Sequence, residues 1–222
     1  MNRTEPWIAW PSRECWIAFA YYYVLIAVLW GVVYGGTCWI TSLHNYRIPL
    51  QVDADLAMPF VPQAIVVYLS LFPMTWLAPF VLRTRQQLAT FAAALAVLIV
   101  CSGCGFLLIP SEEVRSTPVV DGWVAPVFRF ADEVNLSFNN LPCLHVGMAV
   151  LCAYFYSQGK STRARAIVWL WAIAIGISTL VTHQHYIADV VASVGLAAPI
   201  CRYLPSWQWF GTLVGDRHLG AR

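Results

Sequence analysis

The sequence predicts an all-α polytopic membrane protein with six transmembrane helices, its core helices packed as a bundle. Of the 222 residues, 59% are hydrophobic and only 11% are charged, whereas soluble domains carry about 25% charged residues. The mean hydropathy is +0.64. The apolar residues form six runs, and a spanning helix needs about 20 of them. We therefore expect one membrane-embedded domain over residues 1–222, with its motif-bearing core at 50–204.

Polar connections separate the six apolar runs and set the expected helix boundaries. The first run follows a short tail with two tryptophans, which we expect at the membrane interface. The second run is broken by Pro62, Pro73 and Pro79, so we expect kinks in it. The predicted spans are 15–43, 59–82, 88–109, 141–156, 166–181 and 186–204.

The long loop at 110–140 contains one segment with helical periodicity. Its apolar residues recur on one side, opposite a charged side, as in an amphipathic helix. We expect a short interfacial helix there, lying on the membrane surface. Its apolar side either packs on the protein or forms a lid or lipid-access rim. The apolar residues are Trp123, Val124, Val127, Phe128 and Ala131, and the charged ones are Arg129, Asp132 and Glu133.

The distribution of positive charge predicts the orientation in the membrane. Six spans place both termini and the second and fourth loops on one side. Of the thirteen lysine and arginine residues, only Arg47, Arg115 and Arg129 fall on the other side. Because basic residues are retained in the cytoplasm, we expect both termini to be cytoplasmic and the long loop to be extracytoplasmic.

Residues 178–189 bring ionisable side chains into an otherwise apolar sequence. Such side chains are costly at membrane depth and usually have a function. On a helix, His185 and Asp189 would share one face. The carboxylate would then accept the Nδ1 proton and leave Nε2 available as a nucleophile or base. The alternative is a hydrogen-bonded structural pair at a helix end. His183 would point elsewhere, and we expect it to be a bystander.

A second motif at 139–146 opens the fourth apolar run. Pro142 suits the first turn of a helix, so the amides of Cys143 and Leu144 would be free at its N-terminus. Free amides at such an end bind anions. His145 lies beside them and would face the same anion as His185.

These two motifs resemble those of the type 2 phosphatidic acid phosphatase superfamily, and more closely its inositol phosphorylceramide synthase-like branch. The resemblance spans residues 50–195 and rests on Pro-Cys-Leu-His at 142–145 and on Ser178, His185 and Asp189. The segment 55–68 is similar to that branch, and Arg115 to the arginine of the family's first motif.

The sequence departs from the family pattern at three positions. Leu108 stands where the family has a lysine, Cys143 where it has a serine, and Thr179 where it has a phosphate-binding arginine.

The resemblance implies a metal-independent lipid-phosphate phosphatase or phosphotransferase that acts through a phosphohistidine at the extracytoplasmic face. His185 would be the nucleophile, Asp189 would orient it, and His145 would protonate the leaving oxygen. The expected phosphate-binding residues are Arg115, Cys143, Leu144 and Ser178.

Several alternatives stay open at the level of sequence. The acceptor can be water, or an alcohol as in a headgroup phosphotransferase. A proton-coupled carrier would use the same histidines, but a carrier should show paired, interrupted halves. Cys143 could itself be a nucleophile, although cysteine phosphatases have an arginine six residues on, where Ala149 stands here.

The composition also limits partners and cofactors. A net charge of +2, without a basic segment interleaved with aromatics, argues against nucleic acid. Cys101 and Cys104 form a CxxC without a second ligand pair, so we expect no metal there. The expected partners are the bilayer and a lipid phosphate, with no cofactor and no metal.

Overall fold

The computed structural model describes residues 7–111, 119–136 and 138–204, and within these ranges the regular elements are all helices. Three of them are long and apolar enough to cross a membrane: α1 (Arg13–Ser42), α6 (Arg85–Leu108) and α9 (Thr162–Val181). They correspond to the first, third and fifth predicted spans. The fourth and sixth are the shorter helices α8 (Leu144–Ser157) and α10 (Ile187–Tyr203). The count of six membrane crossings stays a prediction.

Polar side chains next to the apolar runs fix where the long helices begin. Ser12 caps α1 by accepting from the Cys15 amide at 3.2 Å. Thr84 accepts from the Gln87 amide at 3.1 Å, while the Gln87 side chain accepts from the Thr84 amide at 3.2 Å. Such a capping box satisfies amides that have no partner inside the helix.

The second predicted span is not one helix. It is divided into η1 (Pro62–Ala64), α3 (Ile65–Leu69), α4 (Leu71–Trp76) and α5 (Ala78–Val81). A proline lacks the amide that would bond to the carbonyl four residues earlier, so Pro79 leaves the Thr75 carbonyl without its helical donor. The Tyr156 hydroxyl of α8 approaches this point, 3.0 Å from the Met74 oxygen and 3.4 Å from the Thr75 oxygen.

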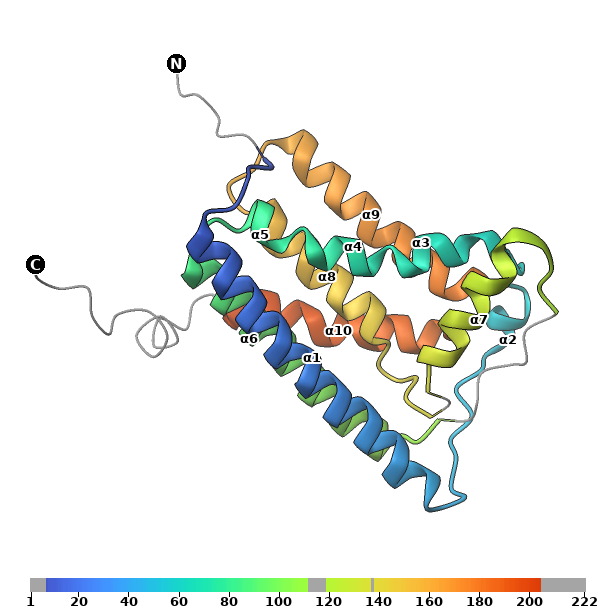
Figure 1. Cartoon of the computed structure of the whole chain (residues 1–222). Coiled ribbons are helices and arrows are strands. Elements are labelled where there is room, and N and C mark those ends of the chain that lie inside the picture. Colours follow the sequence, from blue (N-terminus) through green and yellow to red (C-terminus); the bar gives the residue numbers. More distant parts are fainter. Residues whose placement is uncertain (1–6, 112–118, 137, 205–222) are drawn as a thin grey trace, which may run out of the picture.

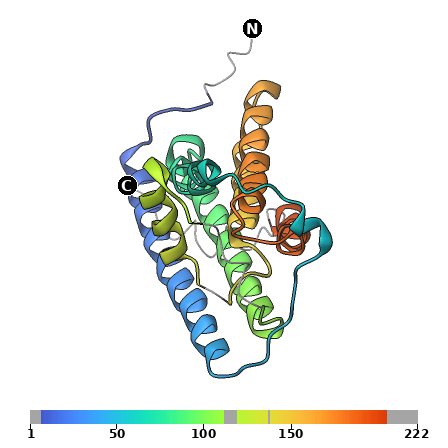
Figure 2. The ribbon, with the colours of Figure 1, turned by 90° about the vertical axis from the view of Figure 1, so that its right-hand side faces the viewer.

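Helix α8 lies at the centre of the bundle. It packs on α4, α6, α9 and α10, while α1 lies along α6 on the outside, as the two views show (Figures 1 and 2). At one end are the start of α1, the α8–α9 turn and the end of α10. At the other end lie α2 (Asp53–Leu56), α7 (Ala125–Val134), the start of α8 and the end of α9 (Figure 1).

The long loop does contain the expected short helix, α7, preceded by η2 (Gly122–Val124). Its apolar side packs on α3, where Phe128 and Ala131 form a buried cluster with Ile65 and Tyr68. Packing on the protein therefore accounts for these residues, although Trp123 next to the helix is 70% exposed. Its position on a membrane surface stays a prediction.

Candidate active site

The first part of the site is the start of α8. Cys143 is the N-cap residue, and Pro142 lies outside the helix rather than in its first turn as predicted. The Cys143 amide donates to the Asp189 carbonyl at 3.3 Å. The Ser193 hydroxyl lies 2.6 Å from the Cys143 carbonyl oxygen and 2.8 Å from that of Asp189. These bonds hold the start of α8 against α10.

The second part is the sharp turn between α9 and α10, which positions His185. Thr182 caps α9, and His183 follows with a φ of 58°, in the left-handed region. The amide of His183 donates to Leu180, and that of Gln184 donates to Thr179, both at 3.1 Å. This is a Schellman motif. The His185 amide also donates to the Thr179 carbonyl, at 3.1 Å.

Asp189 pairs with His185, although not on one continuous helix as predicted. Helix α10 begins at Ile187, so His185 lies in the turn before it. The His185 Nδ1 is nevertheless 3.3 Å from the Asp189 Oδ2, and that oxygen also accepts from the Tyr186 amide at 2.8 Å. Asp189 therefore caps α10 while it orients the imidazole.

The Cys143 sulfur and the Asp189 carboxylate shift the pKa of His185. Burial by itself lowers the pKa of His185, but these two neighbours outweigh burial and hold the pKa above its ordinary value. The surroundings of His185 therefore stabilise positive charge on its imidazole ring.

His145 is held by a residue that the sequence analysis did not single out. The Tyr68 hydroxyl lies 3.1 Å from the His145 Nδ1, and the two rings stack with their centroids 4.0 Å apart. The Asn135 Nδ2 donates to the Tyr68 hydroxyl at 2.8 Å and also bonds to the Gln184 side chain. Gln184 in turn donates to the Asp132 carboxylate at 2.8 Å. This chain of contacts links α3, α7 and the α9–α10 turn.

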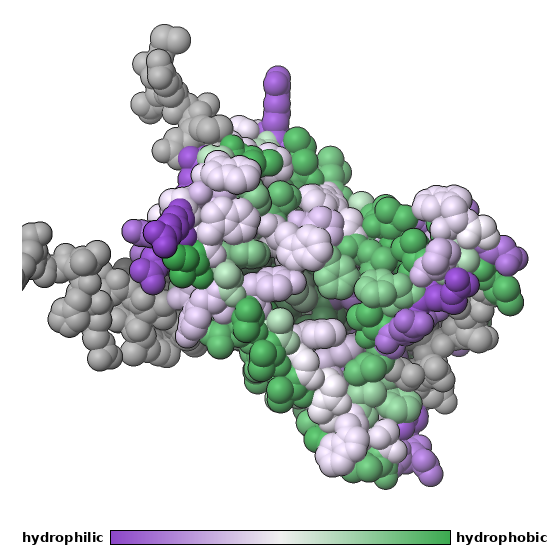
Figure 3. All heavy atoms as spheres, viewed as in Figure 1, coloured by the Kyte–Doolittle hydropathy of each residue, from purple (hydrophilic) through white to green (hydrophobic). Residues whose placement is uncertain are grey.

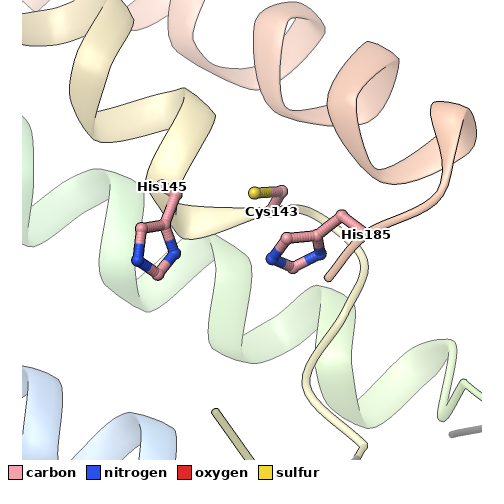
Figure 4. Close-up of side chains that lie close together, drawn as sticks. All are labelled: Cys143, His145 and His185. Atoms are coloured by element: carbon pink, nitrogen blue, oxygen red, sulfur yellow. The ribbon is translucent and has the colours of Figure 1, made fainter. Parts of the chain in front are cut away.

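The two histidines and Cys143 converge on one point (Figure 4). The His145 and His185 ring centroids are 6.3 Å apart. The Cys143 sulfur and one nitrogen from each ring all lie within 4.8 Å of one another. The two sequence motifs, with His145 and His185 40 positions apart, thus form one cluster.

An apolar cavity of about 260 Å³ ends at this cluster. Aromatic and aliphatic side chains from α1, α4 and α6 line most of its length, and His145 and His185 close one end. Figure 3 shows a hollow near the middle of this face, surrounded mostly by apolar and aromatic residues. The residues along its α1 wall are Phe19, Tyr22, Tyr23, Ile26, Ala27, Trp30 and Tyr34.

Of the expected phosphate-binding residues in the described part of the chain, only Leu144 has a first-turn amide without an acceptor inside the helix. Arg115 lies outside the described residues. The Cys143 amide is not free, because it donates to Asp189. Ser178 is buried, and its hydroxyl donates to the Ile175 carbonyl at 2.6 Å within α9. Leu144 opens α8, so its amide belongs to the first turn, whose amides have no acceptor inside the helix.

The polar contacts of His145 could not be read from the two motifs. Tyr68 is 1% exposed in a helix whose sequence looks purely apolar, and Asn135 and Gln184 come from different loops. A tyrosine among aliphatic residues was the one available signal, because a buried hydroxyl needs a hydrogen-bond partner.

Comparison with known proteins identifies one family. The family model described as "PAP2 superfamily" matches residues 2–202. No curated protein matches the chain, and no solved structure matches it.

Proposed function

Because the chain belongs to the PAP2 superfamily, we propose that it is a metal-independent phosphatase or phosphotransferase acting on lipid phosphates. One observation carries this proposal. A carboxylate-paired histidine lies opposite a second histidine, and both close the end of an apolar cavity.

In the first step, the His185 Nε2 attacks phosphorus while the bond from phosphorus to the leaving oxygen breaks. Asp189 holds the Nδ1 proton and stabilises the positive charge that develops on the ring, as the raised pKa of His185 indicates. His145 gives its proton to the leaving oxygen. The products are a phosphohistidine and a free alcohol.

In the second step, water or an alcohol attacks the phosphohistidine. His145, now without its proton, accepts one from the attacking oxygen. The phosphorus–nitrogen bond breaks, and the bonding electrons return to His185. The Leu144 amide and Arg115 would stabilise the phosphoryl oxygens in both steps.

The cavity supports a lipid substrate. It is lined mainly by apolar side chains and lies beside the first candidate span, where an acyl chain would bury apolar surface. The phosphate would lie at the histidine end. On the predicted topology, that end faces the extracytoplasmic side.

The finer assignment we propose is the inositol phosphorylceramide synthase-like branch, in which an alcohol is the acceptor. The segment 55–68 carries that resemblance, and its first and last residues both contact residues of the site or next to it. Asp55 accepts from the Ile187 amide at 2.9 Å and so caps α10, while Tyr68 contacts His145 at 3.1 Å. A hydrolase using water is the alternative.

Turnover of two kinds of substrate by two variants tests the mechanism. His185→Ala should abolish turnover and remove the acid-labile phosphoenzyme. His145→Ala should slow poor, alkoxide-like leaving groups by about 10²–10⁴-fold, but slow an activated phenolic phosphate much less, because that leaving group needs little protonation.

Equal losses on both substrates would remove the general-acid role of His145. A phosphoenzyme that survives in His185→Ala would overturn the mechanism. Product analysis of purified protein with a panel of lipid phosphates, with and without alcohol acceptors, then distinguishes transfer from hydrolysis.

A further inference from the structure

The cluster of Cys143, His145 and His185 has the donor set of a transition-metal site. One sulfur and two imidazole nitrogens lie within 4.8 Å of one another. Ligand atoms around a tetrahedral zinc ion lie about 3.3–3.7 Å apart, given Zn–S and Zn–N bonds of about 2.3 and 2.0 Å. Side-chain rotations that move these atoms by about 1 Å would therefore bring all three into the coordination sphere.

The His185 imidazole is already oriented as a metal-bound histidine usually is. A ligating histidine typically uses its second nitrogen to bond a carboxylate or another polar group, which fixes the ring. The His185 Nδ1 meets Asp189 at 3.3 Å, and the His145 Nδ1 meets Tyr68 at 3.1 Å. The Asp189 contact leaves the Nε2 of His185 as its ligand atom, whereas in Figure 4 the His145 nitrogen on the side of His185 is Nδ1.

The cysteine makes this site selective. A thiolate with two imidazoles suits Zn²⁺ and its soft relatives, whereas Mg²⁺ and Ca²⁺ prefer oxygen. Cys143 is 1% exposed, and the cavity leads to the two histidines beside it.

We propose that Cys143, His145 and His185 bind one Zn²⁺ ion, with a fourth position open to the cavity, and that the ion inhibits the enzyme. The binding is independent of the proposed function. The inhibition rests on it, because the ion would occupy the nitrogens that attack phosphorus and protonate the leaving group.

Cobalt substitution of the purified full-length protein, in detergent and without substrate, tests the binding. Co²⁺ should produce a thiolate-to-cobalt charge-transfer band, which Zn²⁺ displaces. Cys143→Ser should abolish the band, and Asp189→Asn should weaken binding about 10–100-fold by loosening His185. The double variant Cys101→Ser/Cys104→Ser is the matched control and should keep the band, because that pair lies elsewhere, on α6.

Zinc-edge X-ray absorption of the unaltered protein gives a test that does not depend on a variant folding. One sulfur and two imidazoles in the first shell are expected. A shell without sulfur, or a charge-transfer band that survives in Cys143→Ser, would overturn the site, as would no binding at all. If Zn²⁺ binds without loss of turnover, the metal site stands and the inhibition is rejected. If the protein binds Zn²⁺ but turns over no phosphate ester, only the proposed function is rejected.

Discussion

At the scale of single residues, Asp189 connects the chemistry to the fold. The same Oδ2 atom contacts the His185 ring and the Tyr186 amide, and the residue is fully buried. A negative charge near a helix N-terminus is favourable, so the fold stabilises the carboxylate that contacts the histidine. Asp55 caps the same helix start at the Ile187 amide.

We predict that Asp189→Asn lowers turnover about 10²–10⁴-fold, because the amide keeps the shape but neither fixes the tautomer nor stabilises the imidazolium. Asp55→Asn is the matched control, since it weakens a cap of the same helix without touching His185. It should cost about 0.5–2 kcal/mol of stability and much less turnover. Steady-state kinetics and thermal unfolding of both variants make the comparison, and equal kinetic losses would assign Asp189 a purely structural role.

The sequence singled out the proposed reacting residues, but not the residues that hold them. A histidine and a carboxylate stand out in an apolar sequence because they are costly there. Tyr68 and Asn135 do not stand out, and their contacts depend on how α3 and α7 pack on each other. The His185–Asp189 pairing was expected on a helix, but a Schellman turn produces it instead.

At the scale of elements, α6 positions the loop that carries Cys143. A Cβ added to Gly105 would lie 2.7 Å from the Pro142 Cδ and 3.1 Å from the Leu141 oxygen. The second contact is with backbone, which yields less easily than a flexible side chain. The lack of a side chain on Gly105 therefore allows the 141–143 segment to approach α6.

We predict that Gly105→Ala destabilises the protein by about 1–3 kcal/mol and lowers turnover, because the displaced loop moves the start of α8. Gly35→Ala on α1 is the control, since a Cβ there meets nothing within 4 Å. It should be neutral or slightly stabilising, as alanine is the better helix former. Thermal unfolding in detergent and turnover are the measurements, and wild-type values for Gly105→Ala would contradict the close approach.

Element boundaries were predictable where local polar residues mark them. Ser12, Thr84 and Ser161 each cap a helix that begins at the next residue, as apolar runs and capping preferences indicate. The second span was expected to kink at its prolines. The structure goes further and divides this span into α3, α4 and α5. At the break after α4, the Tyr156 hydroxyl of α8 donates to the Met74 carbonyl.

At the scale of the whole molecule, the cavity joins the candidate spans to the site. No periodicity in the sequence predicted it, because it depends on the gap between α1 and the central helices. Ala27 lines it, whereas its neighbour Val28 does not and is 60% exposed.

We predict that Ala27→Phe fills part of the cavity and lowers kcat/KM for long-chain lipid phosphates about 10-fold, equivalent to about 1.4 kcal/mol. Val28→Phe adds the same volume on another side of α1 and should have little effect. A small water-soluble phosphate ester should be turned over equally by both variants. Equal losses on that ester and on the lipid for Ala27→Phe would mean that the cavity does not hold the acyl chain.

The final prediction concerns the orientation in the membrane. It rests on the distribution of basic residues and on the position of the two histidines in the helix bundle. His145 at the start of α8 and His185 in the turn after α9 lie at one end of the bundle. Lys160 in the α8–α9 turn and Arg163 at the start of α9 lie at the opposite end. Basic residues near short loops stay in the cytoplasm. The site should therefore face the extracytoplasmic side, together with the loop that contains Arg115.

Single cysteines at positions 115 and 163 should react with a membrane-impermeant reagent from opposite sides of sealed vesicles. The unaltered chain is the control, because its seven cysteines set the background. A cysteine at 163 should label from the cytoplasmic side, where Arg163 is exposed at the start of α9. Labelling of both positions from the same side would contradict an odd number of crossings between them. It would also contradict the six-span topology, which predicts Arg115 on the same side of the membrane as the histidines.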